Sequence, residues 1–486
     1  MRPLPKWLHT WQLDDIRKMY QSYGIVNMLG VGSGKTVETL STLQLWIDAG
    51  VIDCAVITCK KSSLRITWKA EIDASMPHLD SVYLSGDDDP RKRRKLWQQE
   101  HELYVINHDL ISNRLDKVMI EVLMENRRTA LVCDELQVIR NHTTAMYGNW
   151  CDLREKSHRC IGLTATPLHK SPADLYSMMC AIGARMGSLA RYLDEYCTVQ
   201  KMIVRNPNAF AGFSTIVTPT GFKPGALDRL KKFLQPRTVY RPPDLIKLPA
   251  LRTKDYEVVL NVHERAAYDA IEESKTFPNR HVGMGSVPAE GGFNEVAVRE
   301  WVDANLGQHS RIRAVLSGKV KSTMRPAKDQ LLLEELPQWV ADGGKVIVFS
   351  PYSETTIRLQ KMLQTELKPL SFVTLIGSMT LKQREESINA MRGDLQTVCL
   401  LMTMAGAESL NLQDAANHVC LFDRLYVPAD EDQVLGRVYR QGQQKDCVLH
   451  RFIVRDTVDE SISMVLDRRR RMLNTIKQMA LPEEVK

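Results

Sequence analysis

The sequence contains no apolar run close to the roughly 20 residues that a membrane-spanning helix needs. Its ten cysteines include no C-x-x-C pair, and several lie inside apolar runs. We therefore expect reduced, buried thiols and no zinc site. The first 15 residues contain no apolar segment of the kind that a secretory signal peptide carries, which predicts a cytoplasmic protein.

Charge of one sign is only mildly in excess. The 65 Lys and Arg residues outnumber the 58 Asp and Glu residues by seven, a formal net charge of +7. This excess permits a polyanionic partner without requiring one. The chain of 486 residues, 44% of them hydrophobic, is longer than one hydrophobic core usually covers. We therefore expect two or more globular domains.

Short apolar runs bounded by turn residues recur along the chain and alternate with segments of helical periodicity. They lie at 24–29, 54–59, 103–107, 130–133 and 160–163, and again at 345–349, 372–376, 398–402, 418–422 and 448–454. Strands that alternate with helices predict parallel sheets covered by helices on both faces. Because the pattern occurs twice, we predict an α/β protein with two doubly wound, parallel-sheet lobes.

The domain boundaries are placed where the alternation of apolar runs and helical segments changes. We place the first lobe at 1–245, with a mainly helical protrusion at about 172–240. The second lobe is placed at 327–486 and ends in a basic helix. The intervening 246–326 is predicted to hold a linker and a second helical insertion, with a Gly- and Pro-rich loop at 276–293.

The segment GVGSGKT, residues 30–36, follows the first predicted strand and precedes a helix-like segment. A glycine-rich backbone in this context presents N–H groups to phosphate at the positive end of a helix dipole. We expect Lys35 to reach the β- and γ-phosphates of a nucleotide and Thr36 to bind Mg²⁺. The other loop residues expected around the phosphates are Gly32, Ser33 and Gly34. Leu29 stands where the full phosphate-loop pattern has its first glycine, so a glycine-rich turn without function is the alternative.

An acidic pair, Asp134 and Glu135, directly follows the predicted strand 130–133. Carboxylates at the carboxyl edge of a parallel sheet face a nucleotide crevice. Asp134 is therefore a candidate Mg²⁺ ligand, and Glu135 a candidate base that deprotonates the attacking water. A solvated, acidic helix start is the alternative. Thr164 and Thr166 end the next strand, where their hydroxyls can sense the acidic pair or merely cap the strand.

Near the end of the sequence, DQVLGRVYRQGQ places Arg437 and Arg440 three residues apart, with Gln433 just before them. If two lobes face each other across a nucleotide bound by Lys35, both arginines would reach its γ-phosphate as arginine fingers supplied in cis. Gln433 would join the same contacts. Hydrolysis would then be tied to closure of the lobes. The alternative is a basic helix face in water.

In their order along nearly the whole chain, these motifs resemble those of the superfamily-two helicases, and among them the Swi/Snf-type DNA translocases in a compact bacterial or phage form. Further matching segments are TWQLDD, VITCKKSSLRITWKAEI (56–72), VINHDLIS (105–112), LTATPLHKSPADLYSM (163–178), KVIVFSPYSET, LIGSMTLKQRE and MTMAGAESLNLQDAANHVCLFD (402–423). The resemblance implies two RecA-like lobes with helical insertions between them. It also implies the cofactors ATP and Mg²⁺, an adenine contact from Gln12 and a place for Gly406 in the nucleotide site.

The sequence departs from this family pattern at three places. Gln137 stands in the acidic box where the family usually has His, which bears on the link between hydrolysis and movement. Residues 407–409 replace a glycine-richer stretch, and 426–428 replace the tripeptide W-N-P. None of these changes removes a catalytic group.

The resemblance further implies DNA as a partner, duplex or branched, followed along its phosphate backbone without reading of bases. Short hydroxyl, backbone and basic groups suit phosphate contacts, and the candidates are Ser62, Ser63, Arg65, Gly377, Ser378, Lys382 and Thr403. The basic runs 91–95 and 468–471 are more often solvated faces than binding sites, and the second is a candidate to flank the DNA. Trp68, Trp150 and Trp339 are interpreted as core residues.

The favoured function is a DNA-dependent ATPase that translocates along duplex DNA and remodels forks, branches or protein–DNA complexes in replication, recombination or repair. A strand-separating helicase on single-stranded DNA or RNA is the first alternative. The second is an ATP-gated DNA clamp with little turnover, against which Lys35, Glu135 and Arg440 argue. We expect a monomer without membrane attachment, located in the cytoplasm, at the nucleoid or in a phage-infected cell. A protein partner would be a replication or repair factor.

Overall fold

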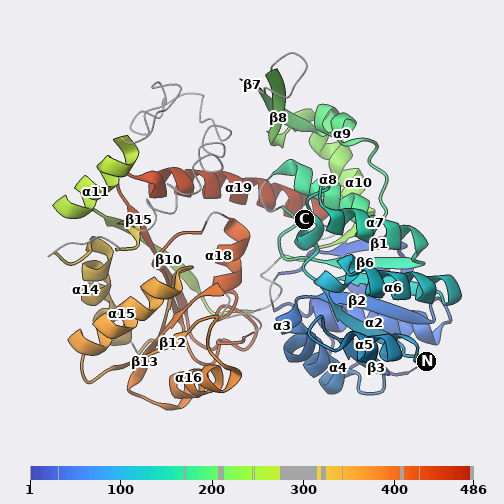
Figure 1. Ribbon diagram of the computed structural model, residues 1–486, viewed down its shortest axis with the longest axis horizontal. Helices are drawn as coiled ribbons and strands as arrows, with labels where there is room; N and C mark the ends of the chain where they lie inside the picture. The colour runs from blue at the N-terminus through green and yellow to red at the C-terminus, as the bar shows by residue number, and fades with distance from the viewer. Residues whose placement is uncertain are drawn as a thin grey trace. The chain divides into compact units, whose positions relative to one another are not determined.

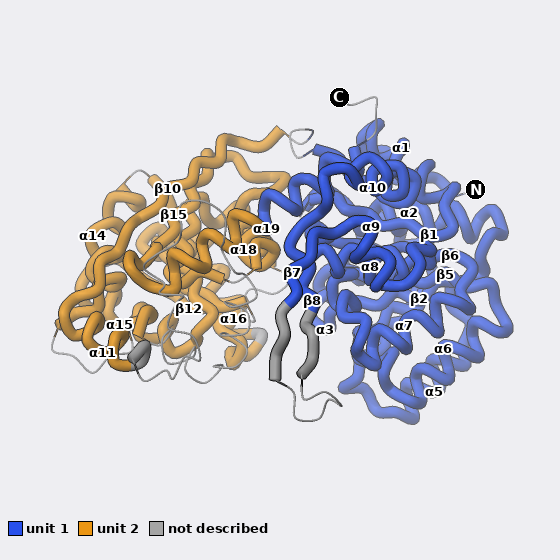
Figure 2. Tube along the Cα trace, turned by 90° about the horizontal axis from the view of Figure 1, so that it is seen from above, with its two compact units in different colours: residues 1–245, 469–486 blue, residues 246–468 orange. Residues whose placement is uncertain are grey.

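The computed structural model divides the chain into two compact units, one comprising 1–245 and 469–486 and the other 246–468 (Figure 2). The residues that the structure describes are 2–30, 32–168, 171–205, 213–242, 245, 247–273, 315–318, 324–341, 343–404, 410–425 and 427–481. The predicted second lobe, 327–486, is wrong at its end, because residues 469–486 belong to the first unit. Among the described helices, none is both long enough and apolar enough to cross a membrane.

The first unit is built on a seven-stranded parallel sheet with the order β3-β4-β2-β5-β6-β1-β9. Figure 1 labels β1, β2, β3 and β6 of this sheet. Its strands are β1 (Gly24–Asn27), β2 (Cys54–Cys59), β3 (Ser81–Leu84), β4 (Leu103–Asn107), β5 (Thr129–Cys133), β6 (Arg159–Leu163) and β9 (Thr238–Val239). Every residue of β2, β4 and β5 is buried. Burial on both faces explains why these strands are continuous apolar runs in the sequence.

Helices cover both faces of this sheet. They are α1 (Thr10–Gln21), α2 (Lys35–Asp48), α3 (Lys61–Ser63), the π-helix η1 (Leu64–Lys69), α4 (Ala70–Ser75), α5 (Pro90–Trp97), η2 (His108–Ser112), α6 (Arg114–Asn126), η3 (Leu136–Ile139), α7 (Ala145–Lys156), α8 (Pro172–Ala181), α9 (Leu189–Tyr196), η4 (Pro224–Ala226), α10 (Leu227–Leu234) and η5 (Gln235–Arg237). Neighbouring strand residues serve different cores, since Val56 belongs to one hydrophobic cluster and Ile57 to another. This is the two-residue period of a strand between two helical layers.

Residues 172–240 are not mainly helical, so that prediction is wrong in part. Besides α8, α9 and α10, they contain β7 (Cys197–Arg205) and β8 (Phe213–Phe222), which pair as a two-stranded antiparallel sheet. The two segments contain several Val, Ile and Thr residues, and β-branched side chains favour strands. The sequence signal for this hairpin was therefore present.

The second unit is built on a six-stranded parallel sheet with the order β10-β15-β14-β11-β13-β12. Its strands are β10 (Leu251–Val258), β11 (Val346–Phe349), β12 (Ser371–Leu375), β13 (Thr397–Met402), β14 (His418–Leu421) and β15 (Cys447–Val454). The helices are α11 (Val262–Glu273), α14 (Ala327–Ala341), α15 (Ser353–Glu366), α16 (Leu381–Gly393), α18 (Pro428–Leu435) and the first part of α19 (Val458–Ala480), which from residue 469 onward belongs to the first unit. The predicted loop at 276–293 lies outside the described residues.

The predicted linker, 246–326, contains a strand of this sheet, which corrects the sequence interpretation. β10 pairs in parallel with β15 from Leu251 beside Cys447 to Val258 beside Val454. Most of its side chains are exposed, since it lies at the edge of the sheet. Charged residues at 252, 254, 255 and 257 leave this edge strand without a continuous apolar run, so periodicity did not identify it.

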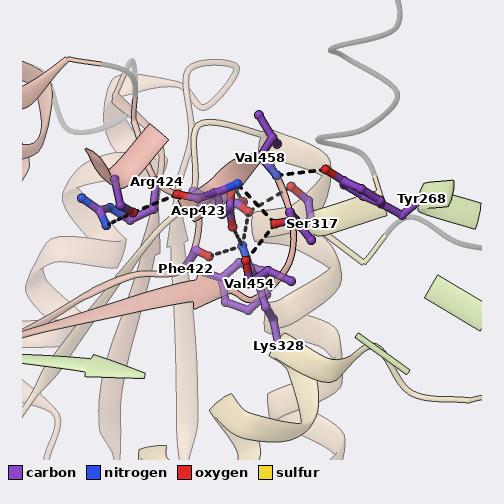
Figure 3. A network of polar contacts seen from close by, with 12 residues as sticks. Tyr268, Ser317, Lys328, Phe422, Asp423, Arg424, Val454 and Val458 are labelled. Carbon is purple, nitrogen blue, oxygen red and sulfur yellow. Dashed lines mark hydrogen bonds and ion pairs between the residues drawn. The ribbon is translucent and has the colours of Figure 1, made fainter. Parts of the chain in front are cut away.

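A buried polar network joins elements of the second unit (Figure 3). Lys328 Nζ of α14 lies 3.2 Å from Asp423 Oδ1, just after β14, and 3.5 Å from Asp459 Oδ2 of α19. The hydroxyls of Ser317 and Ser350 also donate hydrogen bonds to Asp423, over 3.0 and 2.7 Å. All three charged side chains are buried. The network therefore connects α14, the residues after β14 and the start of α19 through one lysine.

Candidate active site

The carboxyl ends of four adjacent strands of the first unit lie at one edge of its sheet. Parallel pairing places Asn27 of β1 beside Leu163 of β6, and Cys133 of β5 beside both Thr58 of β2 and Gly162 of β6. The phosphate loop, the acidic pair and the two threonines directly follow these strands. They therefore gather at the edge where parallel α/β sheets bind ligands.

The phosphate loop has the backbone geometry expected from its glycines. Gly32 and Gly34 have φ values of 75° and 86°, in the left-handed region that glycine adopts at little cost. A Cβ atom at Gly34 would lie 2.6 Å from Gln12 Nε2, so a side chain at this position would collide with α1. α2 begins directly after Gly34 at Lys35, and its free N–H groups can receive phosphate oxygens.

Lys35 is turned back into the loop. Its Nζ donates hydrogen bonds to the carbonyl oxygens of Leu29 and Gly30, over 3.0 and 2.8 Å. Removal from water lowers the pKa of Lys35, and the negative charges of Glu135 and Asp134 oppose this shift. The ammonium group thus lies within electrostatic reach of both carboxylates. A phosphate group would replace two neutral carbonyl partners with charged oxygens.

Asp134 is held from two sides. Its backbone N–H donates to Thr58 O over 2.8 Å, and its Oδ2 accepts a hydrogen bond from Trp68 Nε1 over 3.0 Å. Removal from water and the neighbouring Glu135 raise the pKa of Asp134 to about 6, while the Trp68 hydrogen bond and the charge of Lys35 lower it. The Asp134 carboxyl group is therefore held in one orientation, and its surroundings disfavour its negatively charged form.

Glu135 has a φ of 54°, which is uncommon for a residue with a side chain. Such backbone strain persists only where the surroundings enforce it, and it is concentrated at functional sites. Leu136 follows it and packs so closely on Gly162 that a Cβ atom there would lie 2.5 Å from Leu136 Cδ2. Close packing of the two strand ends thus enforces the conformation of the acidic box.

A chain of hydrogen bonds joins the acidic box to the next strand. Gln137 Nε2 donates to Glu135 Oε2, and Gln137 Oε1 accepts a hydrogen bond from Thr164 Oγ1 over 2.8 Å. The N–H of Thr166 donates to Thr164 Oγ1 over 3.0 Å. The hydroxyl of Thr166 itself finds no hydrogen-bond partner within the described part of the chain. Thr164 is therefore connected to the acidic pair, whereas the coupling roles of these residues stay predictions.

The residues predicted to hold adenine and metal are positioned by α1 and α2. Gln12 is buried on α1, and its Oε1 accepts a hydrogen bond from the backbone of His9 over 3.0 Å. Thr36 is the second residue of α2. Its hydroxyl and the Asp134 carboxylate are oxygen ligands of the type that Mg²⁺ takes, and this ion is commonly shared between one or two protein groups and nucleotide phosphates. The donor set therefore fits Mg²⁺ bound together with ATP, and within the described residues no cluster of three or more His, Cys, Asp or Glu side chains forms an all-protein metal site.

The predicted arginine fork lies in the second unit, in the turn after α18 and not on a helix face. Arg437 Nη1 donates to Leu410 O over 3.3 Å, and Arg440 Nη1 donates to Asn411 Oδ1. Both arginines therefore contact the same short loop. Gln433 precedes them on α18. Gly406 and the substituted residues 407–409 lie outside the described residues.

The predicted DNA contacts form one group in each unit. Ser62 and Ser63 end α3, and the exposed Arg65 lies in η1. In the second unit, the N–H of Thr403 donates to Leu375 O over 3.1 Å, so the ends of β12 and β13 meet just before Gly377 and Ser378. Lys382 follows on α16. Ser378 and Lys382 are exposed, whereas Thr403 is buried.

Two predictions from residue type need correction. Trp68 is fully buried, as interpreted, but its indole N–H is bonded to Asp134, so it is not only a core residue. In the basic run 91–95, Arg93 is buried and its Nη2 lies 3.1 Å from Asp116 Oδ2. That arginine stabilises α5 and α6, while its basic neighbours are exposed. No local pattern in the sequence reveals either pairing, since each joins separate elements.

Comparison with known families and proteins adds independent findings. The SNF2-related domain matches residues 27–284, and the helicase conserved C-terminal domain matches 327–442. The chain is 23% identical over 472 residues to the CHD3-type chromatin-remodeling factor CHR7 of Arabidopsis thaliana, covering 93% of this chain and 36% of that protein. It is 22% identical over 470 residues to the uncharacterized ATP-dependent helicase YqhH of Bacillus subtilis, covering 90% of this chain and 73% of that protein. Among solved structures, the chain is similar to the Sulfolobus solfataricus SWI2/SNF2 ATPase core in complex with dsDNA, with 20% identity and a TM-score of 0.43. That match covers 100% of this chain and 97% of the other chain.

Proposed function

Because this chain belongs to the SNF2-related family, which matches residues 27–284 of its 486, we propose that it is a DNA-dependent ATPase that translocates along duplex DNA. It is an ATP hydrolase of superfamily two. The observation that carries the proposal is the convergence of the phosphate loop, the acidic pair and the Gln137–Thr164 connection at one sheet edge. This arrangement supplies phosphate binding, a base and a link from that base to a neighbouring strand.

ATP binding begins at the N-terminus of α2. The N–H groups of residues 32–36 surround the phosphates, and Lys35 exchanges the carbonyls of Leu29 and Gly30 for β- and γ-phosphate oxygens. This exchange favours the charged ammonium, whose pKa is lowered by removal from water in the free protein. Gln12, which touches the loop at Gly34, contacts the adenine base.

Hydrolysis depends on the acidic box. Thr36 and Asp134 hold Mg²⁺, which when bound neutralises charge on the β- and γ-phosphates. Glu135 orients the attacking water and accepts its proton. Gln137 fixes one carboxylate oxygen of Glu135 and is itself fixed by Thr164. A shift of the strand end at Thr164 is therefore transmitted to the base.

The second unit contributes positive charge to the transferring phosphoryl group. Arg437 and Arg440 leave the loop at 410–411 and bind γ-phosphate oxygens, with Gln433 in the same contact set. Arg440 Nε has no hydrogen-bond partner in the described part of the chain, so it retains a donor for this purpose. Because these residues belong to a different unit from Lys35, turnover follows the closure of the two units on ATP.

DNA is held by its phosphate backbone, through short hydroxyl, backbone and basic groups of both units. These residues are Ser62, Ser63, Arg65, Gly377, Ser378, Lys382 and Thr403. Repeated closure and opening on such contacts moves the protein along the duplex. The substrates are forks, branched DNA or protein–DNA complexes in replication, recombination or repair, with a repair or replication factor as protein partner.

The first test measures ATP turnover by the purified protein alone and with duplex DNA, single-stranded DNA or RNA. We expect the strongest stimulation by duplex DNA, together with displacement of a triplex-forming strand and no unwinding of the duplex. Lys35→Ala abolishes turnover, and Glu135→Gln reduces it about 100-fold or more while ATP binding is retained. Stimulation by single strands alone would support a strand-separating helicase instead. Absence of turnover with each nucleic acid would indicate an ATP-gated clamp.

A further inference from the structure

A single helical segment carries candidate DNA contacts and a direct bond to the acidic pair. Residues 61–69 form α3 and the π-helix η1 directly after β2. Arg65 and Ile66 of this segment face solvent, and Ile66 is 47% exposed. Trp68, two residues later, is 0% exposed, and its Nε1 lies 3.0 Å from Asp134 Oδ2. The segment thus presents one side to solvent and the other to the acidic box.

The backbone of this segment is itself unusual. A π-helix is rare, and short π-helical stretches within helices are frequent at functional sites. Here the stretch LRITWK runs between α3 and α4 (Ala70–Ser75) and contains both Arg65 and Trp68. A change in its winding would turn these two side chains together. The backbone of one short helix therefore joins the exposed side of the segment to the indole.

The bond of Trp68 differs from those of the other buried indoles in this unit. Trp46 and Trp150 donate to backbone carbonyls, those of Tyr20 and Ala181, over 2.9 and 2.8 Å. Trp97 donates to a carboxylate, Asp116, that Arg93 already pairs with. Trp68 donates to the carboxylate assigned to Mg²⁺. An indole is a rigid ring with one N–H donor and no acceptor. Its hydrogen bond to Oδ2 therefore fixes the orientation of the Asp134 carboxylate.

We propose that Trp68 is a positioning residue that orients Asp134 for Mg²⁺ bound with ATP, and that it makes this orientation depend on the DNA-contacting segment 61–69. The second half of this statement rests on the proposed function, because it requires DNA to bind Arg65 and its neighbours. The first half rests only on the bond between Trp68 and Asp134. Residues that orient metal ligands in this way typically change metal affinity about 10- to 100-fold when they are removed.

The variant Trp68→Phe removes the N–H and keeps an aromatic ring. Trp150→Phe is the matched control, since Trp150 is also 0% exposed in the same unit but donates to a backbone carbonyl. The readout is equilibrium binding of a fluorescent ADP analogue with Mg²⁺ and with EDTA. We expect Trp68→Phe to weaken binding about 10-fold in Mg²⁺ and to leave binding in EDTA unchanged. Trp150→Phe should change neither value.

If Trp68→Phe and Trp150→Phe bind the ADP analogue equally well in Mg²⁺, the positioning role is overturned, independently of any result with DNA. If Trp68→Phe does not fold, benzothienylalanine incorporated at position 68 replaces the N–H with sulfur in a ring of the same shape, and the same result is expected. For the DNA link, the measured quantity is the ratio of kcat with and without duplex DNA. We expect Trp68→Phe to lower this ratio without changing the Kd for DNA, whereas Arg65→Ala raises that Kd.

The nucleotide-binding and DNA-stimulation measurements test the positioning role of Trp68 and its link to DNA separately. Suppose that Trp68→Phe binds the ADP analogue more weakly in Mg²⁺ but keeps the wild-type ratio of kcat with and without duplex DNA. This result would support the positioning role and overturn its link to DNA. A wild-type protein that is not stimulated by DNA would contradict the proposed function, and the nucleotide-binding result would still decide whether Trp68 positions Asp134.

Discussion

Thr164 donates a hydrogen bond to Gln137 over 2.8 Å, and Gln137 donates in turn to Glu135. Gln137 uses its amide oxygen towards one neighbour and its amide nitrogen towards the other, which fixes the orientation of the side chain. Because an amide does not titrate, Gln137 itself offers the same donor and the same acceptor to its two neighbours at every pH. The histidine usual at this position in the family would change its pattern with protonation.

Removal of this connection should separate ATP binding from hydrolysis. We expect Gln137→Ala to lower kcat about 10- to 100-fold with little change in KM, because Glu135 loses its orientation and not its charge. Thr164→Val, which keeps the shape of the side chain, should show the same effect to a smaller degree. Steady-state turnover in saturating Mg²⁺ measures both. A fall in ATP affinity without a fall in kcat would contradict the role of Gln137.

Loss of an arginine finger should act on the chemical step. Arg437→Ala and Arg440→Ala are each expected to lower kcat about 10³-fold or more, since arginine fingers contribute on that scale. Arg455→Ala is the control, because Arg455 is an exposed arginine of the same unit that pairs with Glu257 over 3.2 Å. Nucleotide binding to the variants should stay intact. Variants with wild-type turnover would show that the two arginines only support the loop at 410–411.

The network around Lys328 predicts a stability effect confined to the second unit. Lys328→Met leaves Asp423 and Asp459 buried without their cation, and such a loss costs about 3–5 kcal/mol of the free energy of unfolding. Denaturant unfolding of the variant, compared with Lys361→Met on the exposed side of α15, measures the loss. Adding Asp423→Asn and Asp459→Asn to Lys328→Met should recover part of it. If Lys328→Met is as stable as the wild type, the ion pairs of Lys328 with Asp423 and Asp459 contribute nothing to the free energy of unfolding.

His450 predicts a loss of stability in acid. Its Nε2 lies 3.0 Å from His418 Nδ1 and its ring stacks on Trp339, with centroids 3.8 Å apart. Burial, then the neighbouring His418 and Lys254, lower the pKa of His450 to about 3. The unfolded chain binds this proton near pH 6.5, so stability is full above that pH and is lost as pH falls towards 3.

The expected loss from this one group is about 2 kcal/mol at pH 5. His450→Gln keeps hydrogen-bonding capacity without a titrating group, so its stability should change less between pH 7 and pH 5 than that of the wild type. His142→Gln, on an exposed side chain, is the control and should keep the wild-type slope. The same slope in His450→Gln would mean that other groups control acid unfolding.

Local sequence patterns were sufficient for the elements that bury both faces. The strands at 54–59 and 103–107 were predicted with the bounds of β2 and β4, because residues buried on both sides form continuous apolar runs. The phosphate loop was likewise predictable, since its left-handed glycines and the helix that follows are coded by adjacent residues. β10 was missed because an edge strand has little apolar character to detect.

The sequence by itself therefore determined the alternation of strands and helices, the phosphate loop and the acidic box, because each depends on residues near one another in the chain. Only the tertiary structure decided which side chains meet. Trp68 reaches Asp134 because β2 pairs with β5, and Thr164 reaches Gln137 because β5 pairs with β6. The return of residues 469–481 to the first unit, through Leu473 and Ile476, is equally a matter of packing. Hydrogen bonds and apolar contacts between distant segments follow strand order and register, which no local pattern specifies.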